Sequence, residues 1–278
     1  MKIKTIIKLL IIAIISLNLT ACEDNKSSNN KKEEKEVKIT SSLPMPNVKD
    51  EYINKYIKLS QLYDAKTDPS AATKIGYAYS EELKDYDKAI KWYKYSNSMK
   101  PTGINSNYMC YAYQMKKDYD EAIKWCKKAI DLGNKEALFQ LAYTYREKKD
   151  YKKAEEWFIK SFKSKDKDAA MALGYLYTNY LHEYKKAEKY YKESVKIKDL
   201  EANHNLSRLY HHHLKDDVKA SAYAIALIEN KYSKNSVLNI LKDKWKIPNN
   251  IIQKGYELQL NSDDFPIKYK GKLDLDEN

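Results

Sequence analysis

The stretch LAYTYREKKDYKKAEEWFIKS, residues 141–161, decides the fold, because its pattern occurs five times at a period of about 33 residues. An apolar residue is followed by a small one, and a tyrosine stands three positions later, which places these residues on one face of a helix. A short polar segment then leads to an alanine and, three positions on, an aromatic residue. The other four units cover residues 75–96, 109–129, 173–194 and 206–227.

Each unit therefore predicts two helices joined by a short turn. The small residues allow two helix backbones to approach closely, the large aromatic residues fill the remaining space, and Lys, Asp and Glu occupy the outward positions. The predicted aromatic fillers of the second helices are Trp92, Trp125, Trp157, Tyr190 and Tyr223. A single helix pair cannot bury its apolar face alone, so neighbouring pairs must stack into an all-α solenoid.

This pattern resembles the tetratricopeptide repeat, and the phrase AIDLGNKEALFQLAYTY (129–145) is similar to its Sel-like relative. The resemblance covers residues 69–231. It implies a right-handed α-solenoid of about five helix-turn-helix repeats with capping helices. The chain departs from the Sel-like pattern in lacking its Gly-x-Gly turn between helices, and from the tetratricopeptide pattern in its weak aromatic at the early helix position.

The segments that flank the repeats are assigned as caps and a tail. Residues 49–66 are expected to contain a capping helix from about Asp50 to Tyr63, with Tyr52, Tyr56, Leu59 and Tyr63 on one stripe. Residues 232–262 are expected to hold two closing helices, at 236–245 and 250–260. For the tail, 263–278, the alternating FPIKYKGKLDL predicts either a small hairpin around Gly271 or disorder.

The amino-terminal segment has the pattern of an export signal. Lysines precede an apolar run from Leu9 to Leu17, which is too short for a stable membrane span. The run ends in LTAC (19–22), which resembles the lipobox of bacterial lipoproteins and implies cleavage after residue 21 and acylation of Cys22. The alternative is an ordinary signal peptide followed by a chance cysteine. Residues 1–21 are thus read as a lipoprotein signal peptide and 22–48 as a disordered tether.

Composition argues against nucleic acid as a partner. The formal charge is +12, with 51 basic and 39 acidic residues, but only Arg146 and Arg208 carry the guanidinium groups that suit bidentate base recognition. An exported protein would also not meet nucleic acid. We predict a location in the cell envelope, with the protein facing the periplasm. In lipoproteins an Asp after the acylated Cys is linked to retention in the inner membrane. Because this position is Glu23, the sequence favours the outer membrane.

The resemblance also implies where a partner binds. In families of this shape ligands lie in a groove lined by the first helix of each repeat, and the register assigns aromatic, thioether and polar side chains to it. Such a surface suits an extended peptide or an inserted helix. Alternatively, the tyrosines pack against the adjacent repeat. The candidate partner-binding residues are Tyr77, Tyr111, Phe139, Tyr143, Met171, Tyr175, His204 and Arg208.

Two further clusters allow two interpretations each. Cys110 and Cys126 occupy positions that face each other in this fold, as a disulfide or as two buried thiols. His204 and the run His211 to His213 offer imidazoles at helical spacing, but no carboxylate or cysteine joins them at ligand spacing. A partly exposed helix end explains the run as well as a metal does, and we predict neither a metal nor a cofactor.

Nothing in the sequence resembles an active site: it has no glycine-rich phosphate loop, nucleophile elbow or HExxH motif. We therefore expect a non-enzymatic, membrane-anchored envelope lipoprotein that binds another protein or peptide as a scaffold or adaptor, with no small-molecule substrate. One alternative is an immunity protein that captures a secreted toxin such as a lipase effector. A more remote one is an enzyme that processes cell-wall fragments.

Overall fold

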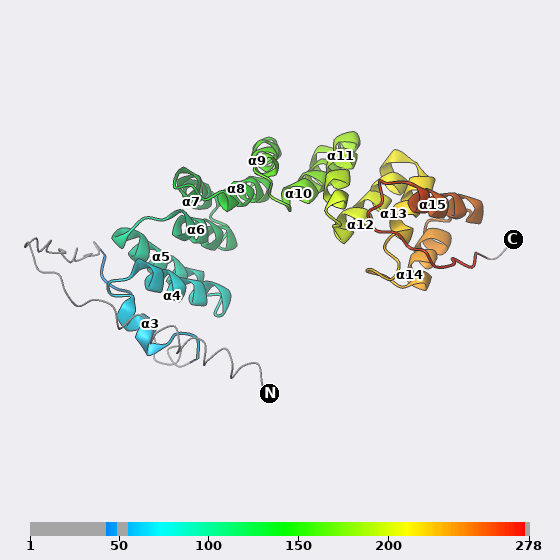
Figure 1. Ribbon diagram of the computed structural model, residues 1–278. Helices are drawn as coiled ribbons and strands as arrows, with labels where there is room; N and C mark the ends of the chain where they lie inside the picture. The colour runs from blue at the N-terminus through cyan, green and yellow to red at the C-terminus, as the bar shows by residue number, and fades with distance from the viewer. Residues whose placement is uncertain (1–42, 49–54, 276–278) are drawn as a thin grey trace, which may run out of the picture. The chain divides into compact units, whose positions relative to one another are not determined.

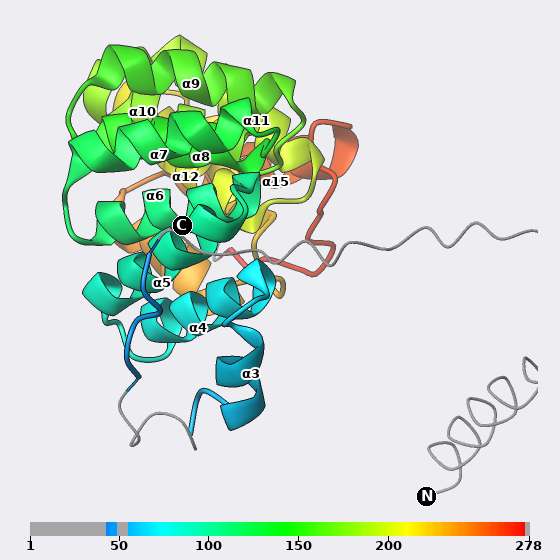
Figure 2. The same cartoon turned by 90° about the vertical axis from the view of Figure 1, so that its left-hand side faces the viewer.

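A computed structural model describes residues 43–48 and 55–275, and within them the fold is an all-α repeat solenoid without a β-strand. The predicted signal peptide, Cys22 and the tether up to residue 42 lie outside the described residues. The five sequence units form five helix pairs, and each helix packs against its neighbours in the chain (Figures 1 and 2). The pairs are α4 (Pro69–Glu81) with α5 (Tyr86–Met99), α6 (Gly103–Met115) with α7 (Tyr119–Asp131), α8 (Glu136–Glu147) with α9 (Tyr151–Lys163), α10 (Ala169–Leu176) and its π-helical end η1 (Tyr177–Leu181) with α11 (Tyr184–Lys196), and α12 (Leu200–Leu209) and η2 (Tyr210–Leu214) with α13 (Asp217–Ile225).

In the first and fourth pairs the small residue of the first helix lies against a tyrosine of the second helix. A Cβ atom added to Gly76 would stand 2.6 Å from Tyr93 Cε1, and one added to Gly174 would stand 2.4 Å from Tyr191 Cδ1. In the second pair the same two positions are Cys110 and Cys126, which form a disulfide with their Cα atoms 5.1 Å apart. This contact fixes the distance between the two helices of a pair.

In the first, second and fourth pairs the residue that faces the small residue of the first helix is the one after the predicted filler, namely Tyr93, Cys126 and Tyr191. Trp92 and Tyr223 are fully buried, but Trp125, Trp157 and Tyr190 are only half-buried. The residue that follows each of these three is fully buried and packs on the first helix instead. These fillers are Cys126, Phe158 and Tyr191.

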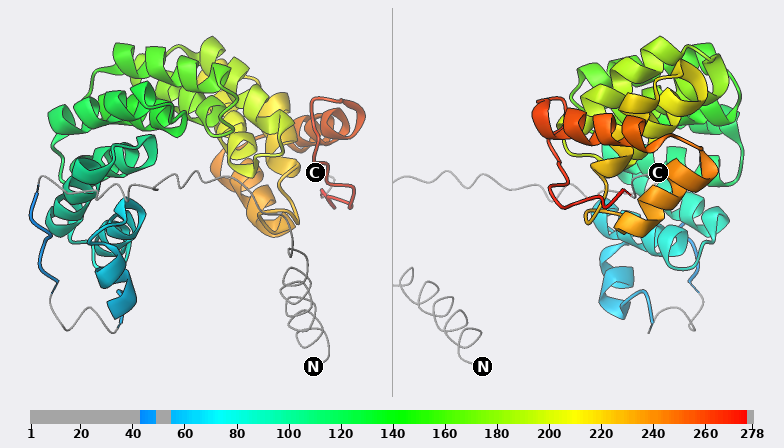
Figure 3. Two further views of the ribbon diagram at one scale, coloured as in Figure 1. Left: turned by 60° about the vertical axis from the view of Figure 1, so that its left-hand side comes forward. Right: turned by 90° about the vertical axis from the view of Figure 1, so that its right-hand side faces the viewer.

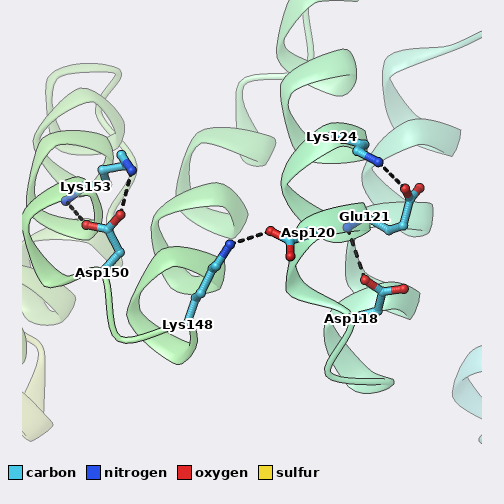
Figure 4. A network of polar contacts seen from close by, with 7 residues as sticks. All are labelled: Asp118, Asp120, Glu121, Lys124, Lys148, Asp150 and Lys153. Carbon is cyan, nitrogen blue, oxygen red and sulfur yellow. Dashed lines mark hydrogen bonds and ion pairs between the residues drawn. The ribbon is translucent and has the colours of Figure 1, made fainter.

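The turn inside each pair is built without glycine. Lys84, Lys117, Lys149, His182 and Lys215 adopt the left-handed conformation there, with φ between 52° and 66°. In four of the five turns the next residue is an aspartate whose carboxylate accepts a hydrogen bond from a backbone N–H in the first turn of the second helix. Figure 4 shows two of these caps, on Asp118 and Asp150. A lysine and an aspartate thus replace the Gly-x-Gly turn that the sequence lacks.

Ion pairs connect successive helix pairs along one edge. The C-cap lysine of a first helix reaches an aspartate in the first turn of the preceding second helix, in Lys116 to Asp87 and Lys148 to Asp120. Figure 4 shows the second of these ion pairs. Between the third and fourth pairs, Lys186 lies 3.5 Å from Glu155. These side chains are largely exposed, so each pair contributes about 0–1 kcal/mol and chiefly favours one register of stacking.

The π-helical ends η1 and η2 absorb one extra residue. In the second pair the N–H of Asp118 donates to the carbonyl of Tyr113, five positions back, whereas in the fourth pair Glu183 donates to Tyr177, six positions back. The longer unit widens the last turn of the first helix into a π-turn, which keeps the second helix in place.

The amino-terminal cap differs from its prediction. Within the described residues α3 spans only Leu59–Asp64, and residues 55–58 lie outside it. Leu59 and Tyr63 of the expected stripe are 55% and 62% exposed. Ile57 and Ala65 are buried instead, because the helix is too short to turn the stripe toward α4.

At the other end, α14 (Lys234–Leu238) continues as η3 (Asn239–Lys244), and α15 (Asn249–Asn261) follows Pro248 and packs on α13 (Figure 3). Up to residue 275, the tail is neither the hairpin nor the disordered segment that its sequence suggests. It is an irregular segment that buries Phe265, Tyr269 and Leu273. The side-chain amide of Gln259 holds it, donating to the Tyr269 carbonyl at 2.8 Å and accepting from the Tyr269 N–H at 3.0 Å.

Replacing Gly174 with alanine tests the close helix contact. We expect Gly174→Ala to lower the free energy of unfolding by about 1–3 kcal/mol, because the added methyl group would overlap the Tyr191 ring. Urea denaturation followed by circular dichroism measures this loss. In a Tyr191→Leu background the same substitution should cost nothing further, and an equal loss in both backgrounds would contradict the contact as the cause.

Candidate partner-binding face

In each of the first four helix pairs, the first helix carries one tyrosine predicted to bind a partner. Tyr77 on α4 and Tyr175 on α10 are 45% and 39% exposed, whereas Tyr111 on α6 and Tyr143 on α8 are half-buried. Arg208 holds the same position on α12 and is exposed. These five residues, together with Arg146, are called the tyrosine–arginine strip below.

Arg146 links two repeats of the strip. Its guanidinium carbon lies 4.2 Å from the ring centroid of Tyr143 and 5.8 Å from that of Tyr175, so one cation contacts aromatic rings on α8 and α10. The guanidinium also pairs with Glu147 at 2.9 Å. Arg146 is not among the binding residues predicted from the sequence. The available signal was its position three residues after Tyr143, on the same helix face.

The strip continues from Tyr175 to Arg208. Both residues line a small cavity of about 90 Å³, together with His212 and His213. At the other end, the Tyr77 ring lies 5.4 Å from that of Tyr108, which stacks on the buried Tyr93 at 5.7 Å. Tyrosine rings at the strip are thus held by other rings, so they present a preformed aromatic surface.

Three predicted binding residues have different environments. Phe139 packs edge to face on Phe158, with ring centroids 5.3 Å apart, and therefore serves the core of its own pair. Met171 is half-buried. The ring of His204 lies 5.8 Å from that of Tyr232, and His204 and Arg208 both line a second cavity, at the carboxyl-terminal end of the repeats.

This second cavity, called the C-terminal cavity below, has a volume of about 230 Å³. Its walls come from the last helix pair, the segment that follows it and the first closing helix, which the fold brings together. No sequence signal predicted it, because its residues are up to 41 positions apart along the chain. They are His204, Ser207, Arg208, His212, Ala224, Leu227, Tyr232, Val237, Ile240, Lys244 and Trp245.

The histidine run is divided among several contacts. His211 stacks on Trp245 at 4.4 Å, and its Nδ1 atom lies 2.7 Å from Asp217 Oδ1. His213 stacks on Tyr184 at 4.1 Å. Among the residues that the structure describes, no three His, Cys, Asp or Glu side chains gather where they would hold a metal ion. The run therefore packs the last pair against its neighbours.

The charges of the repeats are unevenly distributed. The second helices of the five pairs carry 16 lysines and nine acidic residues, a net charge of +7. The first helices carry three basic and four acidic residues, a net charge of −1. The tyrosine–arginine strip thus lies on helices that are almost neutral, where aromatic surface rather than long-range attraction dominates.

Comparison with repeat families agrees with this architecture. The tetratricopeptide repeat model matches residues 135–168, and the Sel1 repeat model matches residues 69–99 and 106–134, so the chain contains repeats of both kinds. No curated protein matches the sequence.

Three solved structures have a similar fold. The first, from a functional characterization of Pseudomonas aeruginosa PilF, is 14% identical, with a TM-score of 0.54, and the match covers 71% of this chain and 94% of that one. The protective antigen c5321 of uropathogenic Escherichia coli, which displays an SLR fold, is 21% identical, with a TM-score of 0.54, over 73% of this chain and 48% of that one. The third, from the Cut9–Hcn1 hetero-tetramer of the APC/C, is 14% identical with a TM-score of 0.50, over 77% and 42% of the two chains. At these identities the likeness defines the fold.

None of the helices between residues 43 and 275 that the structure describes is both long enough and apolar enough to cross a bilayer.

Stability is expected to depend on pH through His204. Burial lowers the pKa of His204, and the nearby Arg208 and Lys231 act in the same direction. Unfolding therefore takes up a proton at this site, so the free energy of unfolding falls as the pH drops below the ordinary histidine value of about 6.5. The urea midpoint of unfolding should be lower at pH 5.5 than at pH 7.5. The difference between the two midpoints should be smaller in His204→Gln. An identical fall in both proteins would rule out His204 as a source.

Proposed function

We propose that this protein is a scaffold or adaptor of the bacterial cell envelope that binds an extended segment or a helix of another protein along the tyrosine–arginine strip. The observation that carries this proposal is the strip itself. Four tyrosines and two arginines form it, on successive first helices, and Arg146 connects two of its repeats. Tyr and Arg are the residue types that contribute most to protein interfaces.

The form of the strip favours an elongated partner. Its residues recur once per helix pair, so a partner must extend across several pairs to contact them all. The rings are held by neighbouring aromatic residues before any partner arrives, which reduces the entropy lost on binding. Tetratricopeptide and Sel1 repeats, both found in this chain, are repeats of proteins that bind other proteins.

The lipid anchor is part of the proposal and is supported by the sequence LTAC (19–22), which follows an apolar run. Acylation of Cys22 with more than one chain would give stable attachment, since one chain alone binds a membrane only weakly. The residues after Cys22 would then connect the membrane to the repeats.

Triple substitution of the strip tests the binding site. We expect Tyr111→Ala, Tyr143→Ala and Tyr175→Ala in one chain to abolish partner capture while helicity stays nearly intact, because none of the three rings is fully buried in the core. In-cell crosslinking, affinity isolation and mass spectrometry measure capture, and circular dichroism measures helicity.

The matched control for this experiment is Tyr63→Ala, which removes a largely exposed tyrosine outside the strip. Its partners should equal those of the unaltered chain. Loss of helicity in the triple variant would show that the tyrosines belong to the core, and unchanged capture by a helical triple variant would refute the strip as the binding site. The identity of the captured protein distinguishes an envelope assembly component from a secreted toxin.

Substitution of Cys22 tests the anchor. Cys22→Ser should move the protein from the membrane fraction to the soluble fraction, because the acyl chains can no longer be attached. Immunoblots of fractionated cells and metabolic labelling with an alkyne fatty acid measure this change. The double variant Cys110→Ala, Cys126→Ala keeps Cys22 and should remain labelled and membrane-bound. A Cys22→Ser protein that stays in the membrane fraction would refute the anchor.

A further inference from the structure

The C-terminal cavity has an apolar interior and a basic rim. Ala224, Leu227, Val237 and Ile240 supply aliphatic surface, and Trp245 supplies an aromatic wall. Trp245 is held in place by His211, which stacks on it at 4.4 Å with the rings nearly parallel. An apolar group that enters the cavity would therefore leave water for a preformed hydrophobic surface.

All ionisable groups that line the cavity, apart from the Tyr232 hydroxyl, are basic: His204, Arg208, His212 and Lys244. The acidic groups beside it are already engaged. Glu201 pairs with Lys231, Asp217 contacts His211, and Asp243 accepts a hydrogen bond from Asn239. Burial lowers the pKa of His204 and of His212, so Arg208 and Lys244 supply the positive charge at neutral pH. The cavity thus combines an apolar interior with a site for an anion.

The cavity is also continuous with the tyrosine–arginine strip. Arg208 and His212 line both the C-terminal cavity and the smaller cavity that reaches Tyr175. A partner segment that follows the strip would arrive at the C-terminal cavity after passing Arg208. The volume of about 230 Å³ is below the roughly 300–1,000 Å³ of small-molecule sites, so it suits one inserted side chain rather than a whole ligand.

We infer that the C-terminal cavity is an anchor pocket that takes one large apolar side chain of a partner segment with carboxylates beside that side chain, which Arg208 and Lys244 bind. The inference rests on the proposed function and adds to it the chemistry of the partner. A single buried anchor of this kind commonly supplies much of the binding energy of an extended segment. The carboxylates would fix the direction in which the segment lies along the strip.

Blocked tripeptides test the pocket on the full chain without a natural partner. The indole N–H signal of Trp245, identified among those of the four tryptophans with Trp245→Phe, reports binding by NMR. Asp-Phe-Glu should shift this signal in a saturable way. Lys-Phe-Lys and Asp-Ala-Glu should each bind at least tenfold more weakly, because the first reverses the charge and the second removes the anchor.

Substitutions on the rim complete the test. Lys244→Gln should weaken the binding of Asp-Phe-Glu roughly threefold or more, whereas Lys242→Gln, on the same π-helical segment but outside the cavity lining, should leave it unchanged. Absence of a saturable Trp245 shift, or equal affinity for the acidic and basic peptides, would overturn the inference.

Failure of the pocket and failure of the strip are distinguishable. Peptide binding at Trp245 involves none of the three tyrosines that the capture experiment replaces, so the triple variant should still bind Asp-Phe-Glu.

Discussion

The structure depends on one steric constraint, the close approach of the two helices of a pair at the small residue of the first helix. Gly76 with Tyr93 and Gly174 with Tyr191 leave no room for a β-carbon, and Cys110 with Cys126 replaces the contact with a covalent bond. Helices held this closely bury their alanines completely, as at Ala89, where no surface is exposed. The pair becomes a rigid unit, and the solenoid is the result of stacking such units.

The binding strip follows from the same constraint. A residue directly after the small one is turned by about 100° around the helix axis, away from the second helix. This position is occupied by Tyr77, Tyr111, Tyr143 and Tyr175. Each of them is at least partly exposed because the small residue before it faces the second helix and is buried. The repeated core thus produces a repeated surface position, which is occupied by tyrosine in four units and by arginine in the fifth.

The sequence predicted the helix pairs and the register of the first helices, but not the phase of the second helices. The five helix pairs and the positions of the strip follow from a register that recurs five times, so an error in one unit is corrected by the others. The predicted filler of each second helix was the aromatic residue three positions after its alanine, although Phe158 and Tyr191, one position further on, point at the first helix. Size alone does not specify which of two adjacent aromatic residues faces inward.

The ends of the chain were harder to predict because their contacts do not repeat. The burial of Tyr269 depends on two hydrogen bonds with Gln259, and the C-terminal cavity depends on the fold bringing His204 and Trp245 into one lining. Contacts of this kind occur once, between residues far apart in the chain, and leave no periodic pattern. Arg146 lies between these cases, because its partner Tyr143 is local but its partner Tyr175 belongs to the next pair.

The position of the disulfide has a mechanical consequence. Each pair contacts mainly its neighbours, so a stretched repeat protein yields one pair at a time. Cys110 and Cys126 are 16 residues apart and join the two helices of the second pair alone among the described repeats. A load applied from the amino-terminal side can separate α4 from α5, but the next pair cannot be drawn out to its full contour length. The solenoid therefore contains, in its second helix pair, one unit whose extension is limited by a covalent loop.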